Sequence, residues 1–200
     1  AFSSHRIAAL GLIRTFQLAR LFQRMTALEN VLAGFHLRTK GGVLAAVLRP
    51  GWFRAQEASI RIRAAELLDL VGLTDQRDAP AASLTYGRQR LLEIARALAA
   101  GPALLMLDEP AAGLNADETR DLAALIARIR GRGVTVLFIE HDMNLVMEVA
   151  ELIHVLDFGR LIASGPPREI QRDPAVIEAY LGGAPPKKTA HQENCHPGQA

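Results

Sequence analysis

The segment 83–115 constrains the fold more than any other part of the chain. A helix is expected over 88–99, and the Gly101-Pro102 pair ends it. The apolar run 103–107 follows without a linker. A continuous apolar run this short, bounded by helix breakers, is typical of a strand that is buried on both faces of a parallel sheet. The segment therefore predicts an α/β fold built on such a sheet.

Two carboxylates, Asp108 and Glu109, come directly after the expected strand. Open α/β sheets bind their ligands at the carboxyl ends of the strands. An apolar strand that ends in two acids is the Walker B pattern of nucleotide-hydrolysing proteins, in which the Asp holds Mg²⁺ and the second acid orients or deprotonates the attacking water. The same pattern also occurs at ordinary strand ends beside a helix cap, so it needs support from other parts of the chain.

The chain after residue 115 alternates between amphipathic helices and apolar strands. The expected helices cover 117–130, 144–150 and 174–181, and the expected strands cover 134–139, 152–156 and 161–163. Glu140, His141 and Asp142 follow the strand 134–139 and should reach the same sheet edge as Asp108, because parallel strands end together. For Glu140 and Asp142, a solvated strand end is favoured over acid/base work beside His141.

The first part of the chain is mainly helical. Thr26 is a suitable N-cap for a helix that runs through Glu29 to Phe35. Residues 39–51 carry three glycines and a proline and predict a loop with a short helix, and Trp52 is placed in that loop. An amphipathic helix is expected over 55–71.

Bulk composition excludes some classes of function. The chain has 200 residues, which fits one domain, and its 23 basic and 21 acidic residues give a net charge of only +2. These charges are spread along the chain, so no nucleic-acid-binding patch is indicated. Cys195 is the only cysteine, which fits a reducing cytosol. No apolar run is long enough to cross a bilayer, so we expect contact with a membrane only through a partner.

A resemblance to a known family rests on five motifs in the right order. The run Leu84-Thr85-Tyr86-Gly87-Arg88-Gln89-Arg90 looks like the signature motif of ABC ATPases, and the Walker B run 104–108 with Glu109 follows at the family's spacing. Residues 112–115 resemble the D-loop, His141 matches the switch histidine, and Gln17 matches the Q-loop glutamine. The similarity covers nearly the whole chain up to Gly182.

Finer matches point to one branch of the family. The run Arg14-Thr15-Phe16-Gln17, the Gly/Pro-bearing insertion before residue 55, residues 139–143 and the ending 179–182 are similar to LivG-type ATPases. These are subunits of importers for branched-chain amino acids and of relatives that carry amides or urea. Tyr86 is usual in this branch, whereas Arg88 places a cation where the commonest signature has Gln.

The resemblance implies a role for each matching residue. Catalysis would fall to Glu109, His141 and Gln17, and Mg²⁺ would be held through water by Asp108 with Gln17 sensing it. Nucleotide binding would involve the signature and D-loop residues Thr85, Tyr86, Gly87, Arg88, Gln89 and Asn115. The physical reason for the signature is that backbone N–H groups at the amino end of a helix favour phosphate.

The resemblance also implies a fold and a domain plan. The fold would be a P-loop NTPase-like parallel sheet with helices on both faces plus a helical subdomain. The ABC ATPase domain would span 1–182, with a helical and signature subdomain over about 16–100 and the remainder of the catalytic core over 101–182. Residues 183–200 are rich in Pro, Lys, Gln and Asn and are expected to be a disordered tail.

One element of the family is missing from the sequence. No Gly-Lys pair occurs, so there is no P-loop, and the aromatic residue that stacks on adenine is absent too. We expect both, together with the antiparallel β part, to lie upstream of Ala1. Without them the chain alone should bind ATP poorly, and Mg-ATP should not raise its melting temperature. An apolar edge and face of the sheet should also be exposed.

The resemblance implies an ATP-hydrolysing subunit of an ABC importer for branched-chain or related amino acids. Its cofactors would be ATP and Mg²⁺, and its partners a second ATPase subunit, as a homo- or heterodimer, and integral membrane permease subunits, with no nucleic acid. It would lie peripherally on the cytoplasmic face of the inner membrane. An alternative is a non-catalytic partner that contributes only its signature face to an intact ATPase subunit. A third possibility, an ABC-type ATPase of translation or DNA repair, is disfavoured by the LivG-type motifs.

Overall fold

A computed structural model of the protein describes residues 3–15, 21–39, 48 and 50–181. The chain divides into two compact units, Ala1–Val149 and Ala150–Ala200, and each is described by itself. The expected Q-loop residue Gln17 and the tail 183–200 lie outside the described residues.

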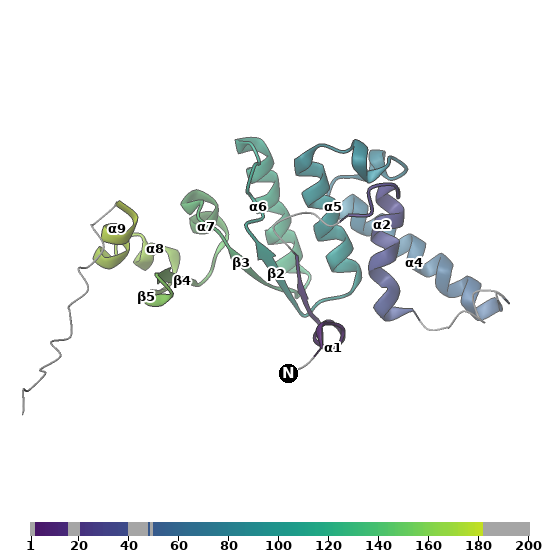
Figure 1. The fold of residues 1–200 in the computed structure, drawn as a ribbon, viewed down its shortest axis with the longest axis horizontal. Helices are drawn as coiled ribbons and strands as arrows, with labels where there is room; N and C mark the ends of the chain where they lie inside the picture. Colours follow the sequence, from purple (N-terminus) through teal and green to yellow (C-terminus); the bar gives the residue numbers. More distant parts are fainter. Residues whose placement is uncertain (1–2, 16–20, 40–47, 49, 182–200) are drawn as a thin grey trace, which may run out of the picture. The chain divides into compact units, whose positions relative to one another are not determined.

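The first unit combines helices with a small sheet (Figure 1). Its α-helices are α1 (Ser4–Ala9), α2 (Ala27–Gly34), α4 (Gly51–Leu70), α5 (Tyr86–Ala99), α6 (Ala116–Gly131) and α7 (Met143–Val149). Short 3₁₀ turns are η1 (Phe35–Arg38), η2 (Thr74–Gln76) and η3 (Ala81–Ser83). Its strands are β1 (Leu12–Arg14), β2 (Leu104–Asp108) and β3 (Thr135–Ile139).

The three strands form one parallel sheet in the order β1-β2-β3. In its register Leu104 pairs with Leu12 on one side and with Thr135 on the other, and Asp108 pairs with Ile139. This arrangement confirms the α/β class with a parallel sheet. Because all three strands run the same way, β2 and β3 deliver the residues that follow them to the same edge.

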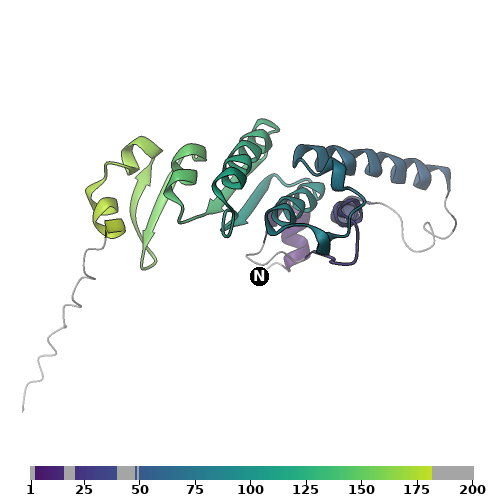
Figure 2. The same cartoon turned by 90° about the horizontal axis from the view of Figure 1, so that it is seen from above.

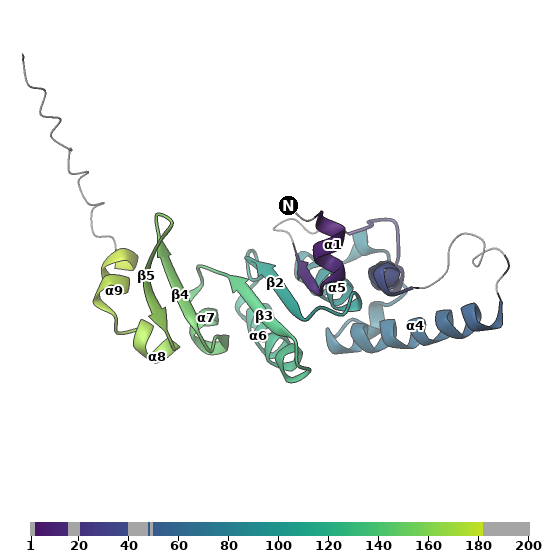
Figure 3. The same ribbon diagram turned by 90° about the horizontal axis from the view of Figure 1, so that it is seen from below.

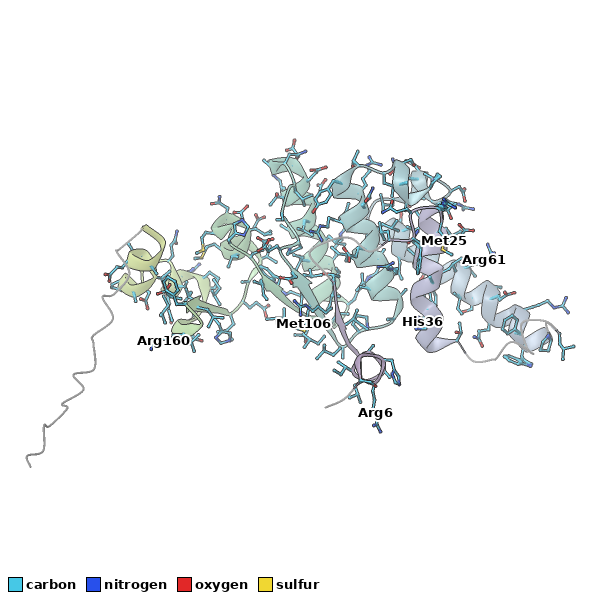
Figure 4. The ribbon with its side chains drawn as sticks, viewed as in Figure 1. Arg6, Met25, His36, Arg61, Met106 and Arg160 are labelled. Atoms are coloured by element: carbon cyan, nitrogen blue, oxygen red, sulfur yellow. The ribbon has the colours of Figure 1, made fainter. Side chains whose placement is uncertain are left out.

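The two faces of this sheet differ in burial. Leu105 and Leu107 are buried in the main core, which they share with α5 and α6. On the opposite face Leu137 and Ile139 remain 46% and 58% exposed. Met106, which Figure 4 labels, lies beside Leu137 in the register of this face. In β2, Leu104 and Met106 on this face are only partly buried. The expectation that 103–107 is buried on both faces is therefore wrong, whereas the expected exposure of an apolar sheet face is confirmed by Leu137 and Ile139.

The helices α2, α4 and α5 pack against one another, and the view from above shows them side by side (Figure 2). Val31, Phe35, Leu68 and Leu92 are buried in the core to which these helices contribute. The predicted N-cap of α2 is confirmed: the Thr26 hydroxyl accepts the Glu29 N–H at 3.1 Å, and the Glu29 carboxylate accepts the Thr26 N–H at 2.8 Å.

Two elements differ from the sequence-based expectation. α4 begins at Gly51 rather than near residue 55, so Trp52 lies in its first turn and not in a loop. The reason is that Pro50 supplies an extended N-cap and no β-branched residue interrupts the next two turns. The strand β1 cannot be read from the sequence, because a three-residue segment carries no pattern of its own and is defined by pairing with β2.

The second unit is a hairpin with two helices. β4 (Ile153–Asp157) and β5 (Arg160–Gly165) pair antiparallel, and α8 (Pro167–Ile170) and α9 (Pro174–Leu181) pack beside β5 (Figure 3). The turn between the strands is made by Phe158 and Gly159, which both have positive φ. The expected strands, turn and final helix of this region are confirmed.

Candidate functional site

The carboxyl ends of β2 and β3 meet at one edge of the parallel sheet. Asp108 is the last residue of β2, and the Glu109 N–H donates to the carbonyl oxygen of Ile139, the last residue of β3, at 2.9 Å. The next residues of β3's connection are Glu140 and His141. The structure thus brings Asp108, Glu109 and His141 to the same edge from segments about 30 positions apart in the sequence.

Glu109 has a strained backbone. Its φ of 45° lies in the left-handed region, which costs a residue other than glycine about 1–2 kcal/mol. Such a conformation persists only where its surroundings hold it, and it is found most often at functional sites. Here the Ile139 carbonyl holds the amide of Glu109, and a second hydrogen bond holds the turn two residues later.

That second hydrogen bond comes from Glu140. Its carboxylate accepts the Ala111 N–H at 2.7 Å and the His141 N–H at 3.2 Å, and its side chain is only 1% exposed. The interpretation of Glu140 as a solvated strand end is therefore wrong. Its main partner, Ala111, lies 29 residues away, so no local pattern could have identified it.

The two neighbours of Glu140 in the motif have different surroundings. The Asp142 carboxylate accepts the N–H of Asn144 at 2.9 Å and so caps the start of α7. It is therefore a helix cap rather than a bare solvated residue. The His141 side chain is 77% exposed and can reach a ligand in solution, and its Nδ1 lies 4.0 Å from the Glu140 carboxylate.

Sequence reasoning missed the partner of Asp108. The Arg14 guanidinium at the end of β1 donates to the Asp108 carboxylate at 2.8 Å. The side chains are 53% and 25% exposed, so this ion pair is partly screened by water. Arg14 precedes Gln17 in the motif, but the pairing spans 94 positions and is set by the register of β1 on β2.

The donor set at this edge can be tested against Mg²⁺. Within the described part of the chain, no three His, Cys, Asp or Glu side chains gather as a metal cluster. Mg²⁺ that accompanies a nucleotide needs only one or two protein carboxylates, since phosphate oxygens and water complete its shell. Asp108 at the strand end therefore fits a metal that arrives with a nucleotide, and not one held by protein ligands alone.

The expected signature residues lie at the start of α5. Thr85 is the N-cap of this helix, and its hydroxyl accepts the Arg88 N–H at 3.5 Å. The Gln89 amide donates back to the Leu84 carbonyl at 3.0 Å, which fixes the loop that leads into the helix. Thr85 and Arg88 are exposed, so the amino end of α5 is open to solvent.

The start of α5 packs closely on the segment that opens α6. A Cβ atom added to Gly113, which has a φ of +77°, would lie 3.1 Å from the Tyr86 ring. A Cβ added to Gly87 would lie 2.5 Å from the Glu118 carboxylate, so this position has no room for a side chain unless Glu118 moves. The expected signature and D-loop are therefore in direct contact within one chain.

Asn115, which is expected to contact a nucleotide, caps the start of α6 in the structure. Its side-chain oxygen accepts the N–H groups of Asp117 and Glu118, both at 3.0 Å, and Glu118 accepts the Asn115 N–H in return. This capping box starts α6, and the sequence signal for it is Asn followed three residues later by Glu.

Models of two protein families match the chain. The family described as "ABC transporter" matches residues 4–112, and the one described as "Branched-chain amino acid ATP-binding cassette transporter" matches residues 160–185. None of the helices in the described ranges is both long and apolar enough to cross a bilayer.

Similar proteins and solved structures agree with these models. The high-affinity branched-chain amino acid transport ATP-binding protein LivG of Escherichia coli (strain K12) is 46% identical over 180 residues, which are 90% of this chain and 71% of that protein. The high-affinity branched-chain amino acid transport ATP-binding protein BraF of Pseudomonas aeruginosa is 49% identical over 181 residues. These are 90% of this chain and 71% of that protein. A crystal structure of the ADP conformation of an ABC transporter cassette has a TM-score of 0.74 and 28% identity, and covers 91% of this chain and 72% of that one.

Proposed function

The chain belongs to the ABC transporter family of ATP-hydrolysing proteins, and from this premise we propose that it serves an importer of branched-chain or related amino acids as the ATPase subunit. The choice of solute is supported by LivG and BraF, which are described as branched-chain amino acid transport ATP-binding proteins. The observation that carries the catalytic part is the meeting of Asp108, Glu109 and His141 at one sheet edge, fixed by the Glu109–Ile139 hydrogen bond.

Each residue at this edge has a chemical task in the proposal. Glu109 orients and polarises the attacking water, and its strained backbone aims the carboxylate. His141 is exposed and contacts the γ-phosphate as charge develops. Asp108, through water, and Gln17, as a further contact, would hold Mg²⁺, and the bound ion would neutralise charge on the phosphates.

The other half of the proposed site is the open start of α5. Backbone N–H groups at this helix end favour phosphate, and the Thr85 hydroxyl lies beside them. In the proposal these groups face a nucleotide held mainly by a second ATPase subunit, so two subunits complete each site. The residues assigned to this surface are Thr85, Tyr86, Gly87, Arg88, Gln89 and Asn115.

The remaining parts of the proposal concern organisation. Residues 1–182 form the ABC ATPase domain, with a helical and signature subdomain over about 16–100 and the remainder of the catalytic core over 101–182. Within the helical part, residues 16–84 dock a membrane permease subunit. The subunit works peripherally at the cytoplasmic face of the inner membrane, together with a second ATPase subunit and permease subunits. Residues 183–200 form a tail with no assigned role.

The experiment mixes this chain with full-length LivG of Escherichia coli and measures ATP hydrolysis of this mixed assembly. Glu109→Gln should lower the activity that depends on this chain by about 10²-fold, because it removes the base without changing shape. Glu66→Gln, an exposed carboxylate on α4, is the matched control and should have no effect. If Glu109→Gln is silent while changes at Thr85 or Gly87 abolish hydrolysis, the chain is a non-catalytic partner that supplies only its signature face.

A further inference from the structure

The buried carboxylate of Glu140 has no place in the proposed mechanism, yet it contacts both segments that carry catalytic groups. We propose that Glu140 is a positioning residue that holds the Glu109 turn and His141 in fixed relation to each other. The inference rests on the proposed function for the roles of Glu109 and His141. The Glu140 clamp is defined as the Glu140 carboxylate together with its two amide donors, Ala111 and His141.

The geometry gives the clamp one oxygen for each segment. Oε1 accepts the Ala111 N–H at 2.7 Å, and Oε2 accepts the His141 N–H at 3.2 Å. A single rigid carboxylate therefore sets the spacing between the turn after β2 and the residue after β3. Both amides lie outside the helices and strands of the first unit, and each donates to the Glu140 carboxylate.

The clamp also explains how the strained turn is kept. Glu109 is held from its amide side by the Ile139 carbonyl, and Pro110 has no N–H to donate. Ala111 is therefore the next donor along the chain, and its bond to Glu140 holds the other side of the turn. With both sides fixed, the left-handed conformation at Glu109 is maintained despite its strain.

The burial of the Glu140 side chain indicates that it does more than fill space in the core. A carboxylate that is 1% exposed pays a desolvation penalty that an apolar side chain of similar size avoids. Two charge-assisted hydrogen bonds offset that penalty, and both go to backbone at the sheet edge. The charge is therefore used to fix the backbone of the two loops.

The first test is amide hydrogen exchange on the 200-residue chain. Glu140→Ala should raise the exchange rate at Ala111 and His141 by about tenfold or more, because both amides lose their partner. Glu140→Gln retains one acceptor oxygen and should release only one of the two amides. Core amides in β2, such as that of Leu107, should keep their wild-type rates, which separates local release from global unfolding.

Glu29→Gln is the matched control. The Glu29 carboxylate also accepts a backbone N–H, that of Thr26 at 2.8 Å, but it lies at the start of α2. This variant should leave exchange at Ala111 and His141 unchanged. Wild-type exchange at both amides in Glu140→Ala would overturn the proposal, whatever the activity measurements give.

The second test is steady-state hydrolysis by the mixed assembly of this chain and Escherichia coli LivG. Glu140→Gln should lower kcat by about tenfold while the KM for ATP changes less than twofold, since misplaced catalytic groups impair chemistry more than binding. Faster exchange with an unchanged kcat would overturn the positioning role. If the wild-type assembly itself shows no activity that depends on this chain, the proposed function fails, and the exchange experiment alone decides whether the clamp exists.

Discussion

The left-handed backbone of Glu109 predicts that a glycine variant is more stable than an alanine variant at this position, which is the reverse of the usual order. Glu109→Ala and Glu109→Gly both remove the carboxylate, so their difference isolates the backbone term. At an ordinary helix position, glycine is less stable than alanine by about 0.5–1 kcal/mol. At a φ of 45° we expect glycine to be the more stable of the two.

The magnitude follows from two opposing terms. Alanine at this φ carries strain of about 1–2 kcal/mol, which glycine avoids. Glycine loses about 0.5–1 kcal/mol through the larger conformational freedom of its unfolded chain. The central values, about 1.5 and about 0.75 kcal/mol, differ by about 0.75 kcal/mol, so we expect Glu109→Gly to be more stable than Glu109→Ala by about that amount.

The assay is urea unfolding at 25 °C, with the transition midpoints of the two variants compared at equal slope. Ala127→Gly, at an exposed position inside α6, is the control and should lose about 1 kcal/mol. Both Glu109 variants lack the carboxylate and should be inactive in the mixed assembly, so their difference in stability should not be accompanied by a difference in ATP hydrolysis. If Glu109→Ala proves as stable as Glu109→Gly, the backbone there is not left-handed and the argument from strain fails.

Three further predictions concern stability. Gly34→Ala should lose about 1–3 kcal/mol in urea unfolding, because its Cβ would collide with the Arg96 carbonyl oxygen. Gly131→Ala has open space and should gain up to about 1 kcal/mol, and equal stability of the two variants would contradict this. Leu107→Ala should lose about 3 kcal/mol by leaving a cavity in the core, and a loss typical of a surface site would show that it is not buried. Arg14→Gln should lose at most about 1 kcal/mol, since the ion pair with Asp108 is partly exposed, and the loss should vanish in about 1 M salt; persistence in salt would mean that Arg14 acts through packing.

Features with a short-range cause could be predicted from the sequence. The N-cap at Thr26 and the helix–strand order around 88–107 depend on residues that are close together in the chain, and the structure confirms them. The turn at 157–160 is of the same kind, because Gly159 accepts a positive φ. The capping box at Asn115 is of the same kind, because Asn115 is followed three residues later by Glu118.

Features with a long-range cause could not be predicted. Glu140 looks like any acid at a strand end until Ala111, 29 residues away, is placed beside it. Arg14 finds Asp108 only through the register of β1 on β2, and β1 itself has no pattern without that pairing. The residue types near the site could therefore be read from the sequence, whereas the contacts that fix their geometry needed the fold.

The central claim is that this chain and a second subunit hold a nucleotide between them, with the start of α5 facing its phosphates. The most direct measurement is sedimentation of this chain with full-length Escherichia coli LivG, with and without Mg-ATP. Thr85→Asn and Thr85→Asp are both good N-caps for α5, but only Asp adds a negative charge opposite the phosphates. We predict that Mg-ATP drives association of the wild type and of Thr85→Asn, and not of Thr85→Asp. Association that is independent of Mg-ATP, or equal association of Thr85→Asn and Thr85→Asp, would contradict the account.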